Sequence, residues 1–203
     1  INGSWFYNDR DSDKIHQFDA QGLLQSTKLR NGWTMSYDYV SVHGAMRLGS
    51  VRNHFGQTLN IEYDEAGHLN KVSMAGVVQA TYRYDSSGRL ATAISADDAA
   101  EIYLYENTAY PYALTGVVDA NQVPHSFFSY DAQGRAVKTE YAGNNQRYQI
   151  GYPTHSGGKT TITDPLGTTR SFNYGTQAGK LAVLSSSSPD PLGRLDAYSR
   201  VQN

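Results

Sequence analysis

Apolar and polar residues alternate along many short segments of this chain, and turn-forming residues follow each segment closely. Examples are residues 79–84, 103–105 and 170–174. Such alternation is typical of a strand with one face turned inward, whereas apolar residues at helical spacing over a dozen positions are almost absent. The pattern therefore predicts an all-β protein of short strands and tight turns.

A seven-residue phrase, aromatic-Asp-x-x-Gly-x-Leu, recurs along the chain. YDEAGHL at 63–69 and YDSSGRL at 84–90 lie 21 positions apart. Because Asp caps its own turn and Gly accepts a positive φ, each copy is predicted to be a hairpin corner. The four copies contain Phe18, Asp19, Gly22 and Leu24; Tyr63, Asp64, Gly67 and Leu69; Tyr84, Asp85, Gly88 and Leu90; and Tyr130, Asp131, Gly134 and Ala136.

A second phrase, Gly-x-Thr followed by a tyrosine seven residues after the glycine, interleaves with the first. It links Gly32 to Tyr39, Gly56 to Tyr63, and Gly167 to Tyr174. Tyr63 ends this phrase and begins a Tyr-Asp turn, so strand follows strand without a helical crossover, which favours antiparallel pairing.

The spacing of the turns adds a longer period. Asp19, Asp64, Asp85 and Asp131 are separated by 45, 21 and 46 residues, close to multiples of about 22. Tyr37-Asp38 is interpreted as a degenerate copy whose turn is lengthened by YVSVHG. Two strands about every 22 residues predict a solenoid-like array.

Composition and charge exclude several classes of function. The 203 residues include 16 Tyr and 19 Gly, no Cys, and a formal net charge of -2. Basic residues are scattered, so no nucleic-acid partner is expected, and no disulfide or thiolate metal site can form. No apolar run is long enough for a membrane span, and the first residues do not resemble a signal peptide.

The Y-D-x-x-G-x-L phrase, with DPLGTTRSFNY at 164–174 and YLYENTAYPYALTGVVDAN at 103–121, resembles the Rhs or YD-repeat proteins of bacteria. These are relatives of the teneurins and of the shell-forming subunits of insecticidal toxin complexes. The resemblance covers residues 16 to 184. It implies a spiral β-sheet of hairpin repeats that forms part of a hollow shell.

The function implied by the resemblance is a structural one. In that family the shell encloses a toxic C-terminal domain before delivery, which implies a polymorphic toxin used in interbacterial competition. The implied partners are the remainder of the shell and that toxin. The implied route is a type VI-like or similar secretion system, with the protein cytoplasmic before export and then secreted or delivered to a target cell. No family cleavage element is matched, because the DPLG segments at 164–167, with Asp164 and Gly167, and at 190–193 are interpreted as repeat turns.

No catalytic, cofactor or metal site is predicted. Asp9, Asp11 and Asp13 alternate as in a calcium loop, but Lys14 and Ala20 stand where such a loop has Gly and Glu. The six histidines lack metal-ligand spacing. The recurrent Asp of the turns is interpreted as a cap, since an active site is used once, and the serine run 185–188 as a loop without a nucleophile motif. We therefore expect no enzyme.

A binding module is the alternative function. Tyrosines at repeat positions are expected to serve the fold, whereas Tyr103, Tyr105, Tyr110 and Tyr112 are not at repeat positions and could form a contact surface for a carbohydrate or a protein. Residues 105–114 of this cluster lie in a longer connection between strands. We expect residues 1–203 to be a single module cut from a longer array, with 1–15 and 185–203 as partial repeats or loops. Its open sheet edges would favour self-association.

Overall fold

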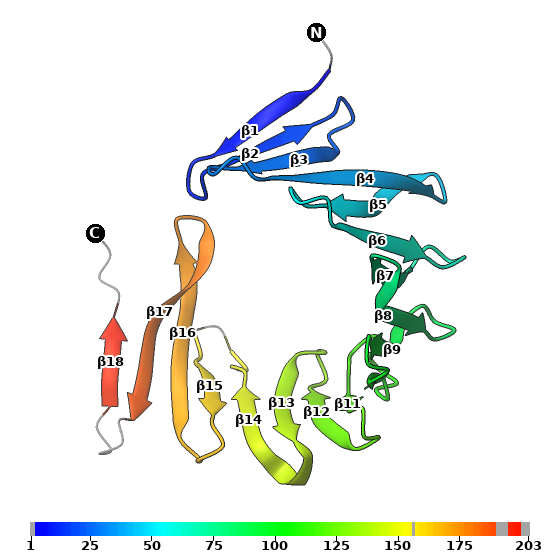
Figure 1. Ribbon diagram of the computed structural model, residues 1–203. Coiled ribbons are helices and arrows are strands. Elements are labelled where there is room, and N and C mark those ends of the chain that lie inside the picture. The colour runs from blue at the N-terminus through cyan, green and yellow to red at the C-terminus, as the bar shows by residue number, and fades with distance from the viewer. Residues whose placement is uncertain (1–2, 156, 190–194, 200–203) are drawn as a thin grey trace. The chain divides into compact units, whose positions relative to one another are not determined.

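The computed structural model describes residues 3–155, 157–189 and 195–199. Antiparallel strands and one short 3-10 turn make up the regular structure of this part of the chain (Figure 1), which confirms the predicted all-β class. The chain divides into two compact units, residues 1–101 and 102–203.

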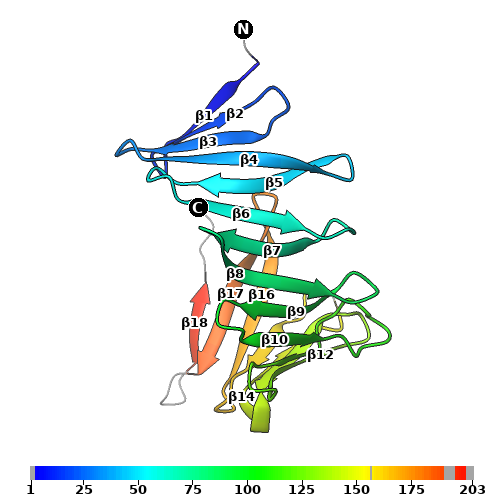
Figure 2. The ribbon, with the colours of Figure 1, turned by 45° about the vertical axis from the view of Figure 1, so that its right-hand side comes forward.

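In the first unit each strand pairs antiparallel with the next strand along the chain, from β1 to β9. Figure 2 shows β4 to β9 as successive rungs of this sheet. The strands are β1 (Trp5–Asp9), β2 (Lys14–Phe18), β3 (Leu24–Leu29), β4 (Thr34–Val42), β5 (Ala45–Arg52), β6 (Thr58–Tyr63), β7 (Leu69–Met74), β8 (Val77–Tyr84) and β9 (Leu90–Ser95).

The second unit repeats the same scheme. Strand β10 (Ala100–Leu104) crosses the boundary between the units and pairs with β11 through residues 102–104. The following elements are β11 (Gly116–Val118), β12 (Pro124–Tyr130), β13 (Ala136–Tyr141), the 3-10 turn η1 (Ala142–Asn144), β14 (Asn145–Gly151), β15 (Thr160–Thr163), β16 (Thr169–Gln177), β17 (Lys180–Pro189) and β18 (Leu195–Ser199).

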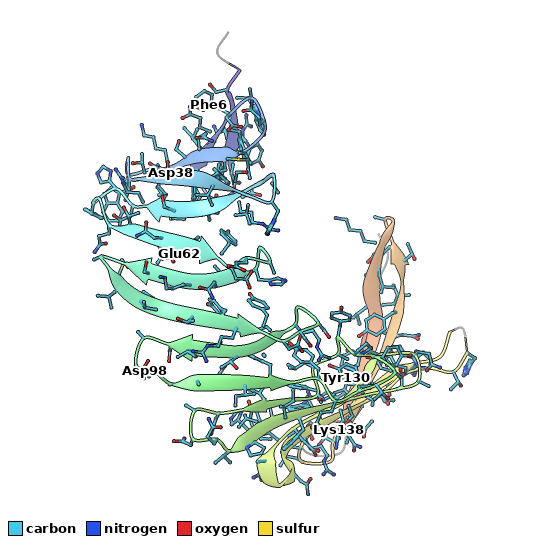
Figure 3. All side chains as sticks on the ribbon, turned by 90° about the vertical axis from the view of Figure 1, so that its right-hand side faces the viewer. Phe6, Asp38, Glu62, Asp98, Tyr130 and Lys138 are labelled. Atoms are coloured by element: carbon cyan, nitrogen blue, oxygen red, sulfur yellow. The ribbon has the colours of Figure 1, made fainter. Side chains whose placement is uncertain are left out.

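The register of β6 and β7 gives this hairpin one apolar face and one polar face. Leu59 and Ile61 of β6 lie opposite Met74 and Val72 of β7 on the apolar face. Glu62 of β6, labelled in Figure 3, lies opposite Lys71 on the other face and forms an ion pair with it at 2.8 Å. Because side chains alternate between faces, the two-residue period of the sequence sorts them in this way.

The described strands contain no buried hydrophobic core. No hydrophobic side chain of the described residues is fully buried, and most of those on the strands are half-buried. Two of the most buried side chains are polar, those of Thr27 and Glu140. Stability must therefore come from the backbone ladder and from contacts between neighbouring strands, as in other repeat arrays.

Two sequence-based interpretations need correction. Ser185–Ser188 was expected to be a loop but belongs to β17, where its backbone pairs with β16 on one side and β18 on the other. Serine has no strong strand preference, so only this two-sided pairing defines the strand. Tyr37-Asp38 lies inside β4, and the turn that follows is at His43 and Gly44, both with positive φ.

The described parts of both terminal segments contain strands. Strand β1 and the first two residues of β2 fall within residues 1–15. The second half of β17 and the whole of β18 fall within residues 185–203. The predicted repeat turn at 190–193 lies outside the described residues.

Candidate functional site: the repeat turns

The turn that starts at Asp64 shows which hydrogen bonds the residues of the repeated phrase form. The N–H of Asp64 donates to the carbonyl of His68 at 2.9 Å, and the N–H of Gly67 donates to the carbonyl of Asp64 at 3.0 Å. The carboxylate Oδ1 of Asp64 accepts from the N–H groups of Ala66 and His68 at 2.9 and 2.8 Å. Gly67 has φ +84°, which an L-residue resists.

The other predicted turns share this geometry. In each one, Oδ1 of the Asp accepts two backbone N–H groups, and the residue three positions later has a positive φ. These turns are Asp19–Gly22, Asp85–Gly88, Asp131–Gly134 and Asp164–Gly167. Asp164 follows an odd-numbered strand and Asp131 an even-numbered one, so their turns lie at opposite ends of the strands of the second unit.

Sequence reasoning expected a glycine turn at Gly56 but missed its cap, and it missed the turn at Asp119 altogether. Asn53 caps the turn to Gly56 with its side-chain oxygen, which accepts from the N–H groups of Phe55 and Gln57. Asp119 caps a turn in which Gln122, with φ +62°, takes the glycine position. The available signal was an Asp or Asn three residues before a Gly or polar residue, without an aromatic residue in front.

A second recurrent contact joins successive repeats through tyrosine hydroxyls. The hydroxyl of Tyr63 donates to the carbonyl of Leu48 at 2.9 Å, and that of Tyr84 to the carbonyl of Leu69 at 3.0 Å. Each bond reaches back 15 or 16 residues. The other pairs are Tyr39 with Leu24, Tyr130 with Leu114, and Tyr152 with Ala136. Phe18 has no hydroxyl and instead stacks on Trp5, with ring centroids 4.0 Å apart.

Rings from an earlier repeat also cover Gly67 and Gly134. The Nε2 atom of His43 lies 2.8 Å from the carbonyl oxygen of Glu65, and a Cβ placed on Gly67 would lie 3.0 Å from the His43 ring. Tyr110 makes the equivalent contact, because its hydroxyl donates to the carbonyl of Ala132 at 2.5 Å and its ring lies against Gly134. Both hydrogen bonds span 22 residues of the chain, so at Gly67 and Gly134 the absence of a side chain also leaves room for a neighbouring ring.

The environment of the turns shifts two kinds of acid in opposite directions. The N–H of His68 is the main cause that holds the pKa of Asp64 below its ordinary value, and the N–H of Arg89 does the same for Asp85. Arg89 also forms an ion pair with Asp85 at 2.6 Å. Burial raises the pKa of the Tyr84 and Tyr130 phenols above the usual value. The lowered pKa favours the ionised carboxylate, which accepts the observed hydrogen bonds. The raised pKa favours the neutral phenol, which donates them.

The turn aspartates have little capacity left for chemistry. One oxygen of each already accepts two backbone hydrogen bonds, and the other oxygen of Asp85 and Asp131 is bound by an arginine. A general base needs a free oxygen directed at a substrate. The geometry therefore supports the capping role and gives these carboxylates a structural function.

The periodic turns and tyrosine bonds correspond to a known family. A family model for the teneurin YD-shell matches residues 50–154. The chain belongs to the teneurin YD-shell family. This confirms the resemblance to Rhs and YD-repeat proteins that the repeated phrase indicated. The family is a structural one, and its members form shells.

Solved structures share the YD-shell fold with this chain. The crystal structure of TcdB2-TccC3 aligns with a TM-score of 0.60 at 14% identity and covers 91% of this chain. Those of TcdB2-TccC3-Cdc42 and of TcdB2-TccC3 without its hypervariable C-terminal region give TM-scores of 0.57 and 0.55 at 13% and 15% identity. The YD-shell chain spans 12% of the length of each matched chain. A search of curated proteins finds no match.

The four tyrosines of the predicted contact surface differ in their surroundings. Tyr103 lies in β10, and Tyr105 follows it at the start of the connection to β11; both are half-buried. Tyr110 is used by the fold, as described above. Tyr112 is 72% exposed. Of these four, Tyr112 alone presents a largely open ring.

The remaining candidates for chemistry form no site. The Asp9 carboxylate accepts from the N–H of Asp11 and from the Ser12 hydroxyl, and Asp13 pairs with Arg30 at 3.2 Å. Within the described residues, His, Asp and Glu side chains nowhere gather in threes that could hold a metal ion. No helix in this part of the chain is long and apolar enough to cross a membrane.

Proposed function

We propose that this chain is a wall segment of a longer YD shell that encloses a toxic C-terminal domain until the toxin is delivered. Membership of the YD-shell family carries the proposal. The repeated turns and tyrosine bonds support it, since they join many of the successive hairpins in the same way. Such regular joining suits an extended wall better than a single active site.

The matched structures support the finer part of the proposal. One of them is TcdB2-TccC3 without its hypervariable C-terminal region, so that protein has such a region at its C-terminal end. By analogy, the polypeptide that contains this chain would be a polymorphic toxin that acts between bacteria. It would be made in the cytoplasm, then exported or injected by a type VI-like or similar secretion system.

Protease protection in the full-length polypeptide tests the proposal. Limited proteolysis followed by mass spectrometry should cut the C-terminal domain much more slowly in the full-length protein than when that domain is expressed alone. Loosening the wall with Tyr63→Phe and Tyr84→Phe together should restore cleavage. Tyr7→Phe is the matched control, because within the described residues the Tyr7 hydroxyl makes no hydrogen bond. Equal cleavage of the free and the full-length C-terminal domain would contradict enclosure.

A binding role is the second candidate, and one observation favours it. The exposed Tyr112 ring lies in the connection between β10 and β11 and could stack on a sugar or a partner side chain. Screening of the chain against a glycan array should then give signals that Tyr112→Ser removes. The absence of any glycan signal, or a signal that Tyr112→Ser leaves unchanged, would contradict a glycan-binding site at this residue.

A further inference from the structure

One repeat of the second unit departs from the tyrosine pattern. Tyr174 continues the series, since it lies 22 residues after Tyr152 and seven after Gly167. Fifteen residues before it stands Lys159, two positions after Gly157, which has φ +80°. Leu24 and Leu69 stand at this place after Gly22 and Gly67, and their carbonyls accept the hydroxyls of Tyr39 and Tyr84. Lys159 therefore occupies a position that carries leucine in other repeats.

The tyrosine bond is missing at this position. Among the residues that the structure describes, no group accepts a hydrogen bond from the Tyr174 hydroxyl, and the side chain is 46% exposed. Lys159 is exposed, and the preceding residue, Gly158, has no side chain. At this repeat the apolar side chain is thus replaced by lysine, and no carbonyl group of the described residues accepts the tyrosine hydroxyl.

An open groove of about 570 Å³ lies at this repeat. Its walls include Ile150, Tyr152, Ile162, Tyr174 and Leu181. Ile150 and Ile162 are paired across β14 and β15, so they share one face of the sheet. Leu181 is 78% exposed, although it is a large apolar side chain. Such a volume and lining are within the range of ligand grooves.

The charge and polarity of the groove restrict what can bind there. Arg135 lies at its wall, but its guanidinium is stacked on Tyr152 at 4.3 Å and paired with Asp131 at 2.7 Å. Among the described wall residues none is Asp, Glu, Asn or Gln, the side chains that commonly bind sugar hydroxyls. An apolar group with one hydrogen-bond acceptor fits better than a saccharide or an anion.

We propose that this groove binds a leucine side chain of an extended peptide segment from another polypeptide, with the peptide carbonyl accepting the Tyr174 hydroxyl. The chain makes this pairing within itself where Tyr39, Tyr63, Tyr84 and Tyr130 bind the carbonyls of Leu24, Leu48, Leu69 and Leu114. The inference goes beyond the proposed function and does not depend on it, because it follows from comparing repeats within one chain.

A peptide copied from an intact repeat is the probe. A blocked peptide with the sequence of residues 67–72, GHLNKV, should shift the methyl signals of Ile150, Ile162 and Leu181 in NMR spectra of the 203-residue protein. The same peptide with Ala in place of Leu should bind about tenfold more weakly or worse, because it loses most of the apolar contact. Equal effects of the two peptides, or no methyl shifts with the leucine peptide at millimolar concentration, would overturn the proposal.

A variant that fills the groove from within provides the second test. Lys159→Leu restores the repeat pattern, so it should raise the melting temperature and weaken binding of the leucine peptide about tenfold or more. Lys159→Gln removes the charge without supplying leucine and should bind the peptide as the unmodified protein does. Tyr174→Phe keeps the ring but removes the hydroxyl, and should weaken binding several-fold. Undiminished binding to Lys159→Leu would show that the peptide does not use the leucine position.

Discussion

The tyrosine hydroxyl is the smallest part of this protein that links one repeat to another. The Tyr63 ring stands at the end of β6, and its hydroxyl reaches the carbonyl of Leu48, which lies 15 residues earlier in β5. A net contribution of about 1 kcal/mol is usual for such a bond. The same bond recurs in several repeats, so its small contributions to the free energy of unfolding add up along the chain.

Tyr63→Phe should lower the free energy of unfolding by about 1 kcal/mol, because the carbonyl of Leu48 loses its donor while the ring remains. Urea denaturation followed by circular dichroism measures this change. Tyr7→Phe, in the same unit, removes a hydroxyl that makes no hydrogen bond in the described part of the chain, and should change stability little. Equal effects of the two variants would show that the hydroxyl contact does not contribute.

We expect Asp85 to make the stability of the protein sensitive to acid. The pKa of Asp85 is held below its ordinary value, chiefly by the N–H of Arg89. Such a group contributes stability above its unfolded value of about 3.9 and loses it as the pH falls through the lower folded value. We therefore expect the urea concentration at the midpoint of unfolding to decrease when the pH is lowered below about 4.

Asp85→Asn provides the matched control for acid sensitivity. An amide can still accept the backbone N–H groups, as Asn53 does in its own turn, but it cannot be protonated in this range. The variant should be somewhat less stable at neutral pH and should lose less stability in acid. An unchanged acid profile would contradict a role for Asp85 in the pH dependence.

At the scale of the element, the hairpin corner is the unit that repeats. In most copies a capping oxygen stands at the first position, and a residue with positive φ follows three residues later. Gly67 and Gly88 adopt the positive φ without strain. Gln122, with φ +62°, adopts it at a cost, since left-handed conformations are unfavourable for side chains with a Cβ.

Gln122→Gly should therefore stabilise the protein, by up to about 1 kcal/mol after the greater flexibility of glycine in the unfolded chain is subtracted. Thermal unfolding followed by circular dichroism measures the effect. Gln133→Gly, at the tip of the next hairpin, is the control, because Gln133 does not have a positive φ. That substitution should be neutral or destabilising. A loss of stability in Gln122→Gly would contradict the assumed strain.

At the scale of the whole molecule, the described residues bury little apolar side-chain surface. The described residues contain no fully buried hydrophobic side chain, and three successive aromatic residues of β1 are 49%, 66% and 55% exposed. Exposed aromatic residues on a strand favour pairing with another chain. Within a longer YD shell, neighbouring repeats would cover such surfaces.

The isolated 203-residue chain should therefore associate. Light scattering after size exclusion should give a mass above that of the monomer, increasing with protein concentration. Phe6→Lys places a charge among the exposed aromatic residues of β1 and should shift the population toward monomer. A monomer at all concentrations, with a cooperative and high melting transition, would contradict the expectation.

The sequence alone determined the class of fold and the corners of the repeat. Turn chemistry and a two-residue period are local properties, because Asp, Gly and alternating side chains act within a few residues. These signals were sufficient for the turns at Asp19, Asp64, Asp85, Asp131 and Asp164. They were insufficient where the local pattern is weak, as at Asn53, at Asp119 and in the serine run of β17.

Only the tertiary structure decided which groups meet across repeats. The tyrosine bonds span 15 or 16 residues and the contacts of His43 and Tyr110 with later turns span 22, so no local pattern reveals them. Sequence reasoning assigned Tyr110 to a contact surface, whereas its hydroxyl serves the turn of another hairpin. The position of a side chain across a sheet depends on the register of several strands, and register becomes definite only when the strands pair.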